Sequence, residues 1–279
     1  TCALPISNNG MTLVAPAGYV AKIDTSTAKQ VNVIVQLDAP YWDGQNTTAN
    51  AAVDGGTGNW DAASTNWTNV AGATNSAWTV GSVAVFDGSA GTVTVASTQS
   101  IGGLQFETDG YTVTGSTLNG VATTNKLQVS NASDTATVAS VLTGSNAWTK
   151  SGAGTLVLAG ANTYTGATTV NAGTLEVDGS LASGSAVTVK QGGTLLGTGT
   201  VNGAVTVQSY GVLRAGTVGT PGTLTTGALT VNSGVTTYLR LGQTRGQVKV
   251  NGNLTLRGTL RTISPSGDSI VVGTNIVMT

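Results

Sequence analysis

The chain of 279 residues contains 40 Gly, 49 Thr, 11 Lys and Arg, 12 Asp and Glu, one Cys and no His. This composition excludes a Ser-His-Asp triad, a Cys-His dyad, a His-ligated zinc site and an intramolecular disulfide, and so few cations make a poor nucleic-acid binder. Because 39 % of the residues are hydrophobic and only 5 are Pro, the chain can bury a core and is not expected to be disordered.

The sequence pattern of residues 1–10 differs from that of the rest of the chain. We expect this segment to be a non-native leader, and Cys2, which lies in it, is given no role. Residues 11–80 follow as an N-terminal region in which the alternating segment 31–37 predicts a strand. No stretch reaches the ~18–20 consecutive apolar residues of a membrane helix, so no transmembrane segment is expected.

Four of the five Trp residues are gathered in this N-terminal region, at Trp42, Trp60, Trp67 and Trp78. Large rings with a polar edge suit the end of a stack of β-coils, where the first coil has no neighbour below it. The clustering therefore predicts a Trp-rich cap. The alternative is a platform for sugar rings, which makes Trp42, Trp60 and Trp67 candidate glycan contacts.

Residues 81–279 contain two families of short, similar sequence segments. Both families consist of β-branched residues interrupted by Gly. One family opens with Gly-Thr and an apolar residue, at Gly91, Gly154, Gly173 and Gly193. The other ends in a marker Val that is soon followed by Gly, at Val170, Val189, Val207, Val231 and Val250. The marker residues are 19, 18, 24 and 19 positions apart.

A period of about 20 residues with two short strands per period predicts an all-β protein, a parallel β-solenoid that fills residues 81–279 and is truncated at the C-terminus. Alternate strand residues should point inward and form aliphatic ladders, which include Leu156, Leu158, Leu175, Val177, Val189 and Val207. A β-sandwich or a propeller is the alternative, but both need antiparallel hairpins and usually larger aromatics in the core.

Gly and Asn suit the tight corners of such coils, where the backbone often needs a positive φ. Asn171, Asn232 and Asn251 each follow a marker Val directly. We therefore expect these three amides to stack at one corner of the solenoid.

Two carboxylate pairs have i, i+2 spacing, Glu107 with Asp109 and Glu176 with Asp178. Each pair should share one face of a strand, and glycosidases use two carboxyl groups about 5 to 10 Å apart. Outward polar residues are expected on any solenoid strand, however, so both pairs are interpreted as solvated surface. No catalytic, cofactor-binding or metal-ligating residue is predicted.

The charges are unevenly distributed along the chain. Residues 1–178 carry 4 basic and 11 acidic residues, whereas residues 179–267 carry the other seven basic residues and no acid. The simplest interpretation is drift at exposed positions. The functional alternative is attraction of the basic region to anionic outer-membrane lipid or polysaccharide.

Residues 148–177 read WTKSGAGTLVLAGANTYTGATTVNAGTLEV. This segment resembles the passenger-associated strand repeat of bacterial autotransporters, the type V secretion proteins. The Trp-Asp elements at Trp42 and Trp60 are similar to the start of such passengers, so the resemblance spans roughly residues 41–260. It implies a right-handed parallel β-helix that is exported through the protein's own C-terminal outer-membrane β-barrel, which is absent from this chain.

The resemblance also implies a function. The chain is expected to be a passenger segment at the bacterial cell surface or in the medium, a stalk or adhesin that meets a host-surface or matrix ligand without catalysis. The repeat is expected to aid folding during secretion. The alternative is a parallel β-helix protein that acts on, or binds, polysaccharide.

Overall fold

The computed structural model describes residues 19–24, 32–37, 39–217, 220–232, 237–241, 246–257, 260–262, 269–272 and 275–278. The predicted leader, residues 1–10 with Cys2, lies outside them. The chain divides into two compact units, Thr1–Ala39 and Pro40–Thr279. The regular structure of the described residues consists of strands, and no helix long and apolar enough to cross a membrane occurs among them.

The first unit contains one antiparallel hairpin, formed by β1 (Tyr19–Asp24) and β2 (Asn32–Leu37). Tyr19 pairs with Leu37 at one end and Asp24 with Asn32 at the other. Alternating Val and Ile residues favour this extended backbone. The strand predicted at residues 31–37 is therefore confirmed over its described residues, Asn32–Leu37.

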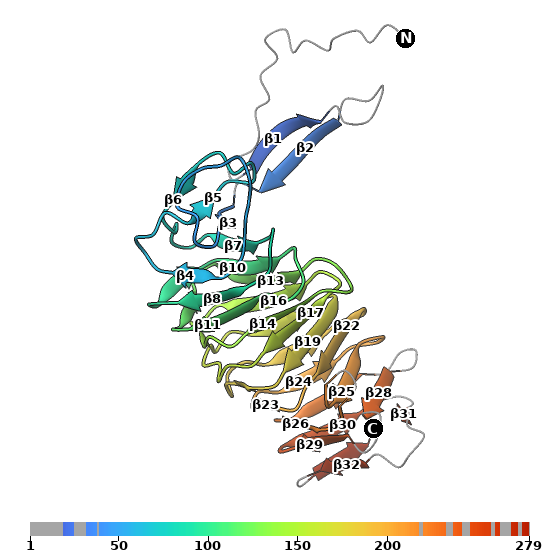
Figure 1. Cartoon of the computed structure of the whole chain (residues 1–279). Helices are drawn as coiled ribbons and strands as arrows, with labels where there is room; N and C mark the ends of the chain where they lie inside the picture. Colours follow the sequence, from blue (N-terminus) through green and yellow to red (C-terminus); the bar gives the residue numbers. More distant parts are fainter. Residues whose placement is uncertain are drawn as a thin grey trace, which may run out of the picture. The chain divides into compact units, whose positions relative to one another are not determined.

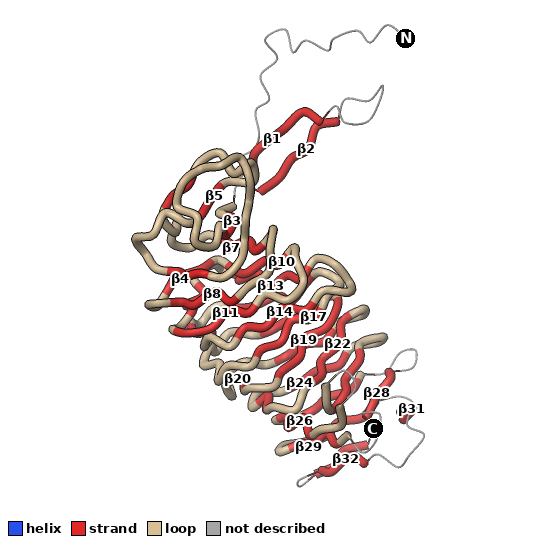
Figure 2. Tube along the Cα trace, viewed as in Figure 1, coloured by secondary structure: helices blue, strands red, loops and turns tan. Residues whose placement is uncertain are grey.

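The second unit is a parallel β-solenoid whose coils contribute strands to three faces (Figure 1). From β7 onward the chain visits a first sheet, a second sheet and a third face in turn, so neighbours in a sheet are three strands apart in sequence. The coil of β16 and β17 differs because it has no named strand on the third face. Figure 2 shows the strands of successive coils in rows, joined by loops at the corners.

The first sheet has thirteen strands. They are β3 (Tyr41–Trp42), β5 (Trp67–Thr68), β6 (Asn75–Ser76), β7 (Val83–Phe86), β10 (Gly103–Phe106), β13 (Thr124–Val129), β16 (Ala147–Ser151), β18 (Thr168–Val170), β21 (Val187–Val189), β24 (Val205–Val207), β27 (Leu229–Val231), β30 (Asn253–Leu256) and β33 (Asn275–Met278).

The second sheet has ten strands among the described residues. They are β4 (Gly58–Trp60), β8 (Thr92–Val95), β11 (Thr112–Gly115), β14 (Thr135–Val138), β17 (Thr155–Leu158), β19 (Gly173–Val177), β22 (Gly193–Leu196), β25 (Val212–Ala215), β28 (Thr237–Leu241) and β31 (Leu260–Thr262).

The third face consists of a three-stranded and a five-stranded sheet. The first contains β9 (Gln99–Ile101), β12 (Leu118–Gly120) and β15 (Leu142–Thr143). The second contains β20 (Ser180–Leu181), β23 (Thr200–Val201), β26 (Thr223–Thr226), β29 (Gln247–Val250) and β32 (Ser269–Val272). Most coils thus have three strands, and the prediction of two per coil is wrong. The third-face strands β20 and β23 have only two residues each and show no alternating pattern, and Val250 of β29 was assigned to the markers of the first sheet.

Backbone pairing confirms the predicted period. The marker residues from Val170 to Val231 pair in register, one coil after another. Val231 then pairs with Leu256, whereas the predicted next marker, Val250, lies in β29 on the third face. The prediction for Val250 failed because coils after Val207 lengthen to 24 and 25 residues, from 19 and 18 before it.

The same change in coil length makes the predicted row of three Asn residues wrong at its third member. Asn171 and Asn232 follow strands of the first sheet and share a corner, as expected. Asn251 follows β29 and therefore lies at a different corner. Its place in the row is taken by Arg257, which follows β30.

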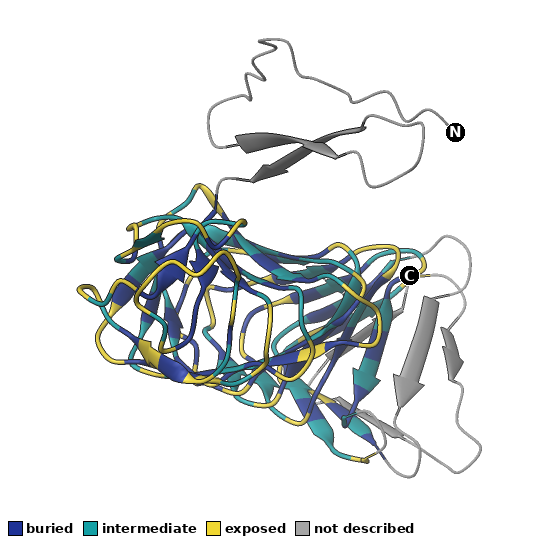
Figure 3. Ribbon diagram, turned by 45° about the horizontal axis from the view of Figure 1, so that its top comes forward, coloured by how far each residue is buried: buried dark blue, intermediate teal, exposed yellow. Residues whose placement is uncertain are grey.

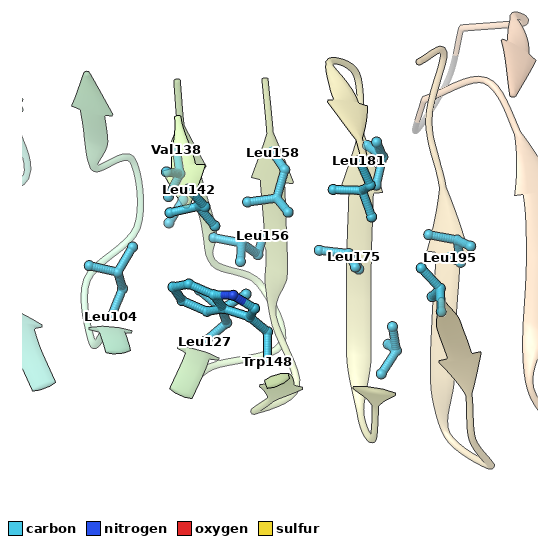
Figure 4. Packing of buried hydrophobic residues seen from close by; sticks show 14 of the residues in the cluster. Leu104, Leu127, Val138, Leu142, Trp148, Leu156, Leu158, Leu175, Leu181 and Leu195 are labelled. Carbon is cyan, nitrogen blue, oxygen red and sulfur yellow. The ribbon is translucent and has the colours of Figure 1, made fainter. Parts of the chain in front are cut away.

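Aliphatic ladders fill the interior of the second unit, as the side chains in Figure 4 show, and Figure 3 shows buried positions along its strands. Leu156 pairs with Leu175 and Leu175 with Leu195, so one Leu lies over the next. All six residues predicted to point inward are completely buried: Leu156, Leu158, Leu175, Val177, Val189 and Val207. Complete burial of such a side chain contributes roughly 1.5–3 kcal/mol, so each coil depends on the coils beside it.

Parallel stacking already includes β3 and β4, ahead of residue 81, where the coils were expected to begin. β3 pairs with β7 at Tyr41 and Val85, and β4 pairs with β8 along Gly58–Trp60. The antiparallel strands β5 and β6 continue the first sheet beyond β3. These short strands cover the edge that a stack of parallel strands would otherwise leave open.

We predict that Leu175→Asp melts the solenoid locally. The change places an unpaired carboxylate in a ladder between two coils, which costs several kcal/mol or forces the group to take up a proton. Hydrogen exchange should show lost protection in β17, β19 and β22 and retained protection in β8 and β11, because contacts are made between neighbouring coils. Thr155→Asp, on the outer side of β17, is the control and should leave protection unchanged. Uniform loss of protection from β8 to β27 would contradict the nearest-neighbour description.

Candidate functional site

Five aromatic rings form a cluster in the first coils of the solenoid. Trp42 of β3, Trp60 of β4 and Trp67 of β5 are completely buried. The ring centroids of Trp42 and Trp67 are 5.1 Å apart and those of Trp60 and Trp67 are 4.9 Å apart, both edge to face. Trp78 and Phe86 pack on the same rings. Edge-to-face contacts of this kind stabilise aromatic clusters beyond simple burial, so the predicted Trp-rich cap is present.

Tyr111 ties the cluster to the backbone of the first coil. Its hydroxyl donates to the carbonyl oxygen of Asp87 at 2.6 Å and accepts a hydrogen bond from the backbone N–H of Gly56 at 3.2 Å. Burial raises the pKa of Tyr111 to about 12. The hydroxyl therefore keeps its proton at neutral pH and remains a hydrogen-bond donor.

The three Trp residues named as candidate glycan contacts have no exposed ring face. Trp42, Trp60 and Trp67 are each 0 % exposed. A sugar stacks on the open face of a ring, and here each ring is covered by the others. Glycan contact at these residues is therefore not proposed, and their position accounts for them as the interior of the cap.

The coil of β16 and β17 has a lysine in its core. Lys150 is completely buried, and the three hydrogens of its Nζ are shared among four backbone carbonyl oxygens within hydrogen-bond distance. They belong to Ser151 at 2.9 Å, Gly152 at 3.1 Å, Gly154 at 2.9 Å and Ala172 at 3.3 Å. Because Ala172 lies in the following coil, the ammonium group joins the corners of two successive coils. Burial lowers the pKa of Lys150 to about 8.

Gly173 allows the backbone of the next coil to pack closely against this corner. Its φ is +63°, and a Cβ added to it would lie 2.5 Å from the oxygen of Gly152 and 2.6 Å from that of Gly154. These are two of the carbonyl groups that accept from Lys150. Any residue other than Gly at this position would push the second coil away from the lysine.

Asn162 bridges the two sheets of the third face, where the coil has no strand. Its Oδ1 accepts a hydrogen bond from the N–H of Leu142 in β15 at 2.9 Å. Its Nδ2 donates to the carbonyl oxygens of Gly160 at 2.9 Å and Ser180, in β20, at 3.2 Å. The amide thus supplies both a donor and an acceptor in place of a strand backbone.

Two aromatic residues complete this coil. Trp148 and Tyr164 are completely buried, and their ring centroids are 5.5 Å apart. The hydroxyl of Tyr164 shares a hydrogen bond of 2.8 Å with Thr168, which in turn lies 3.2 Å from the hydroxyl of Ser185 in the next coil. The coil is therefore held to its successor by polar groups inside an apolar interior.

The pair of Glu176 and Asp178 differs from the solvated surface that was predicted. Glu176 is only 7 % exposed, because the apolar Val157 and Leu196 flank it in the neighbouring coils. Burial, the Asp178 charge and a hydrogen bond to that carboxylate raise the pKa of Glu176 to about 7, which Arg214 lowers in part. Asp178 itself is exposed.

The two carboxylates of the other pair serve separate partners. Glu107 accepts hydrogen bonds from the side chains of Gln105 and of Ser130, the latter at 2.7 Å. Asp109 accepts from the backbone N–H of Thr135 at 2.7 Å. Each acid thus holds a residue of a neighbouring coil, which is a structural role. In the described part of the chain, no group of three potential metal ligands is present.

Sequence reasoning did not identify Lys150 and Asn162. A signal was present for the lysine, because Trp148 and Lys150 are two residues apart in a strand and must share a face. The role of Asn162 had no such signal, since it depends on a missing strand that only the paired sheets reveal.

The sheets define a parallel β-solenoid, and buried side chains hold this coil to its neighbours. A family model described as Passenger-associated-transport-repeat matches residues 149–177, which run from β16 to β19 and so include this coil and the first two strands of the next. The chain is also 37 % identical over 131 residues to the Adhesin BmaC autotransporter of Brucella suis biovar 1 (strain 1330). The similarity covers 41 % of this chain and 4 % of that relative. The chain thus carries a passenger-associated repeat within a parallel β-solenoid and is similar, over part of its length, to an autotransporter adhesin.

We predict that Lys150→Met destabilises the repeat coil by about 2–4 kcal/mol. Several buried carbonyl oxygens lose their donor, while removal of a desolvated ammonium group offsets part of the loss. Hydrogen exchange at residues 151–154 and 172–174 should rise. Lys190→Met, at an exposed position after β21, is the matched control and should change stability by less than about 0.5 kcal/mol. Equal effects of the two variants would show that the buried contacts of Lys150 contribute nothing.

We predict that Glu176→Gln makes stability less sensitive to pH. The pKa of Glu176 is about 7 in the folded chain and 4.5 in the unfolded chain, so the parent loses stability as pH rises from 4.5 to 7. Near pH 5 the variant should match the parent, and at pH 8 it should be more stable by about 1–3 kcal/mol. Urea unfolding at the two pH values measures this difference. Parallel pH profiles for parent and variant would refute the assignment.

Proposed function

We propose that this chain is part of an autotransporter passenger that is exported across the outer membrane and displayed on, or released from, the bacterial cell surface. It acts there as a stalk and adhesive surface without catalysis of its own. The observation that carries the proposal is the passenger repeat at residues 149–177, which is built into a continuous parallel solenoid. The similarity to an autotransporter adhesin supports the same role.

The proposed role of the repeat is to aid folding during secretion. A coil of a solenoid cannot bury its apolar face alone, so a coil that is internally well satisfied provides a template for its neighbours. The repeat coil has such features, because Lys150, Asn162 and Tyr164 each make buried hydrogen bonds that reach the coil before or after them.

The proposed partners follow from this role. In the whole protein, the protein's own C-terminal outer-membrane barrel would translocate the passenger. A host-surface or matrix ligand would bind to the outer faces of the coils. Single contacts with such faces are weak, but many copies on one cell gain strength through multivalency.

An enzyme that acts on polysaccharide is the alternative. Glycosidases need two carboxyl groups separated by about 5 to 10 Å, with substrate between them. Glu176 and Asp178 are instead hydrogen-bonded to each other, and Glu107 and Asp109 hold separate groups of the next coil. This geometry supports the non-catalytic role.

The test is display of the chain on cells. Fused to a signal sequence and an autotransporter barrel in a bacterial host, the parent should reach the surface, where added protease removes it from intact cells. The double variant Lys150→Met/Asn162→Ala should reduce display several-fold, because the repeat coil folds poorly. Lys190→Met serves as the control and should display like the parent.

Two outcomes would overturn the proposal. Display of the double variant at the parent level would remove the folding role from the repeat. Turnover of a polysaccharide by the purified chain, lost in Glu107→Gln or Glu176→Gln, would favour the enzyme instead.

A further inference from the structure

One corner of the solenoid carries a row of polar side chains that the passenger role does not explain. The row lies where strands of the first sheet end, and the backbone N–H of each member bonds to the preceding coil. Gln208 bonds to the oxygen of Val189 at 2.9 Å, Asn232 to that of Val207 at 3.0 Å and Arg257 to that of Val231 at 2.9 Å. These bonds fix the three residues in register, one per coil.

A groove lies along this row. It is an open hollow of about 530 Å³ lined by Gln191, Gln208, Ser209, Asn232 and Arg257. The lining comes from four successive coils, so it spans three coil spacings, about 14 Å at the usual separation of strands. All five side chains are polar, and the groove therefore suits a ligand that is rich in hydroxyl groups or charge rather than an apolar one.

An exposed aromatic ring stands directly beside the groove residues. Tyr210 follows Gln208 and Ser209 in sequence and is 44 % exposed. Its φ is +61°, a conformation that bulky side chains rarely adopt. Gly173 and Gly192 hold the same corner position in the preceding coils with φ of +63° and +81°, so the turn itself sets this conformation and places the Tyr210 ring at the corner. The Trp rings of the cap are buried, but this Tyr ring offers a face to solvent.

The charge around the groove is positive. Arg257 lines it, and Lys190, next to Gln191, is exposed at the same corner. Residues 179–267 contain no acid. An Arg guanidinium can bind a carboxylate with two parallel hydrogen bonds, and the field of the whole region attracts anions.

We infer that this groove binds an acidic polysaccharide, a chain of sugars that carry carboxylate groups. The amides of Gln191, Gln208 and Asn232 can both donate to and accept from sugar hydroxyls, Arg257 pairs with a carboxylate, and Tyr210 packs against a sugar face. An anionic lipid surface would need only a flat cationic patch, and neither a hollow lined with amides nor an exposed ring. The inference rests on the adhesive role proposed above and supplies the class of ligand.

The test is binding of the purified full chain to sodium polygalacturonate, with neutral dextran as the comparison, by titration calorimetry at low and high salt. We expect binding to polygalacturonate that weakens with salt, and none to dextran. Arg257→Gln should weaken binding about tenfold. Lys249→Gln removes the same charge from β29, on the third face, and should have little effect.

Tyr210→Gly separates ligand binding from folding. Gly adopts a φ of +61° without strain, so this variant should be at least as stable as the parent in urea and yet bind polygalacturonate at least fivefold more weakly. Unchanged binding would remove Tyr210 from the site.

Three further results would overturn the inference. They are absent binding to polygalacturonate, equal losses in Arg257→Gln and Lys249→Gln, and binding to vesicles with phosphatidylglycerol but not to the polymer. The last result would assign the corner to a lipid surface. Because the experiment uses purified chain, it can fail while surface display succeeds, so the two proposals are tested separately.

Discussion

The parallel hydrogen-bonded stacking of one coil on the next is the constraint on which every other feature of the solenoid depends. It repeats each position about every 20 residues, so an inward residue always meets its counterparts above and below, as Leu175 meets Leu156 and Leu195. Only groups that are apolar, or fully hydrogen-bonded, can occupy such a position. Lys150 is accepted in the core because the corners of two coils provide carbonyl oxygens for its ammonium group.

The same constraint explains how much of the molecule could be predicted from the sequence. The ladders and the period could be predicted because Val, Leu and Gly recur in register from Val170 to Val231. The shortest third-face strands could not, since a strand such as Ser180–Leu181 has too few residues to alternate. Val250 was misplaced because longer coils shift the sequence pattern against the pairing.

The sites were harder to predict than the fold. Glu176 looked like an outward polar residue, and its low exposure depends on apolar neighbours in other coils, Val157 and Leu196, which no local pattern reveals. The corner groove likewise depends on residues about 20 positions apart, from Gln191 to Arg257. The interior side chains thus hold the coils together. The side chains at the corners are free to vary and are available to bind other molecules.

The gap that Asn162 bridges also has a mechanical consequence. At this coil the first and second sheets run through without interruption, whereas the third face changes from one sheet to another. It is joined there by the isolated bridge of Ala161 and Ser180, by the Asn162 amide and by single backbone hydrogen bonds such as those from Thr163 and Tyr164 to the oxygen of Leu142. A coil that is held by paired strands on two faces and by isolated contacts on the third has a bending stiffness that depends on direction. A sideways load on the third face of this coil is therefore carried by single hydrogen bonds rather than by a paired strand, so the resistance of the solenoid to bending depends here on the direction of the load.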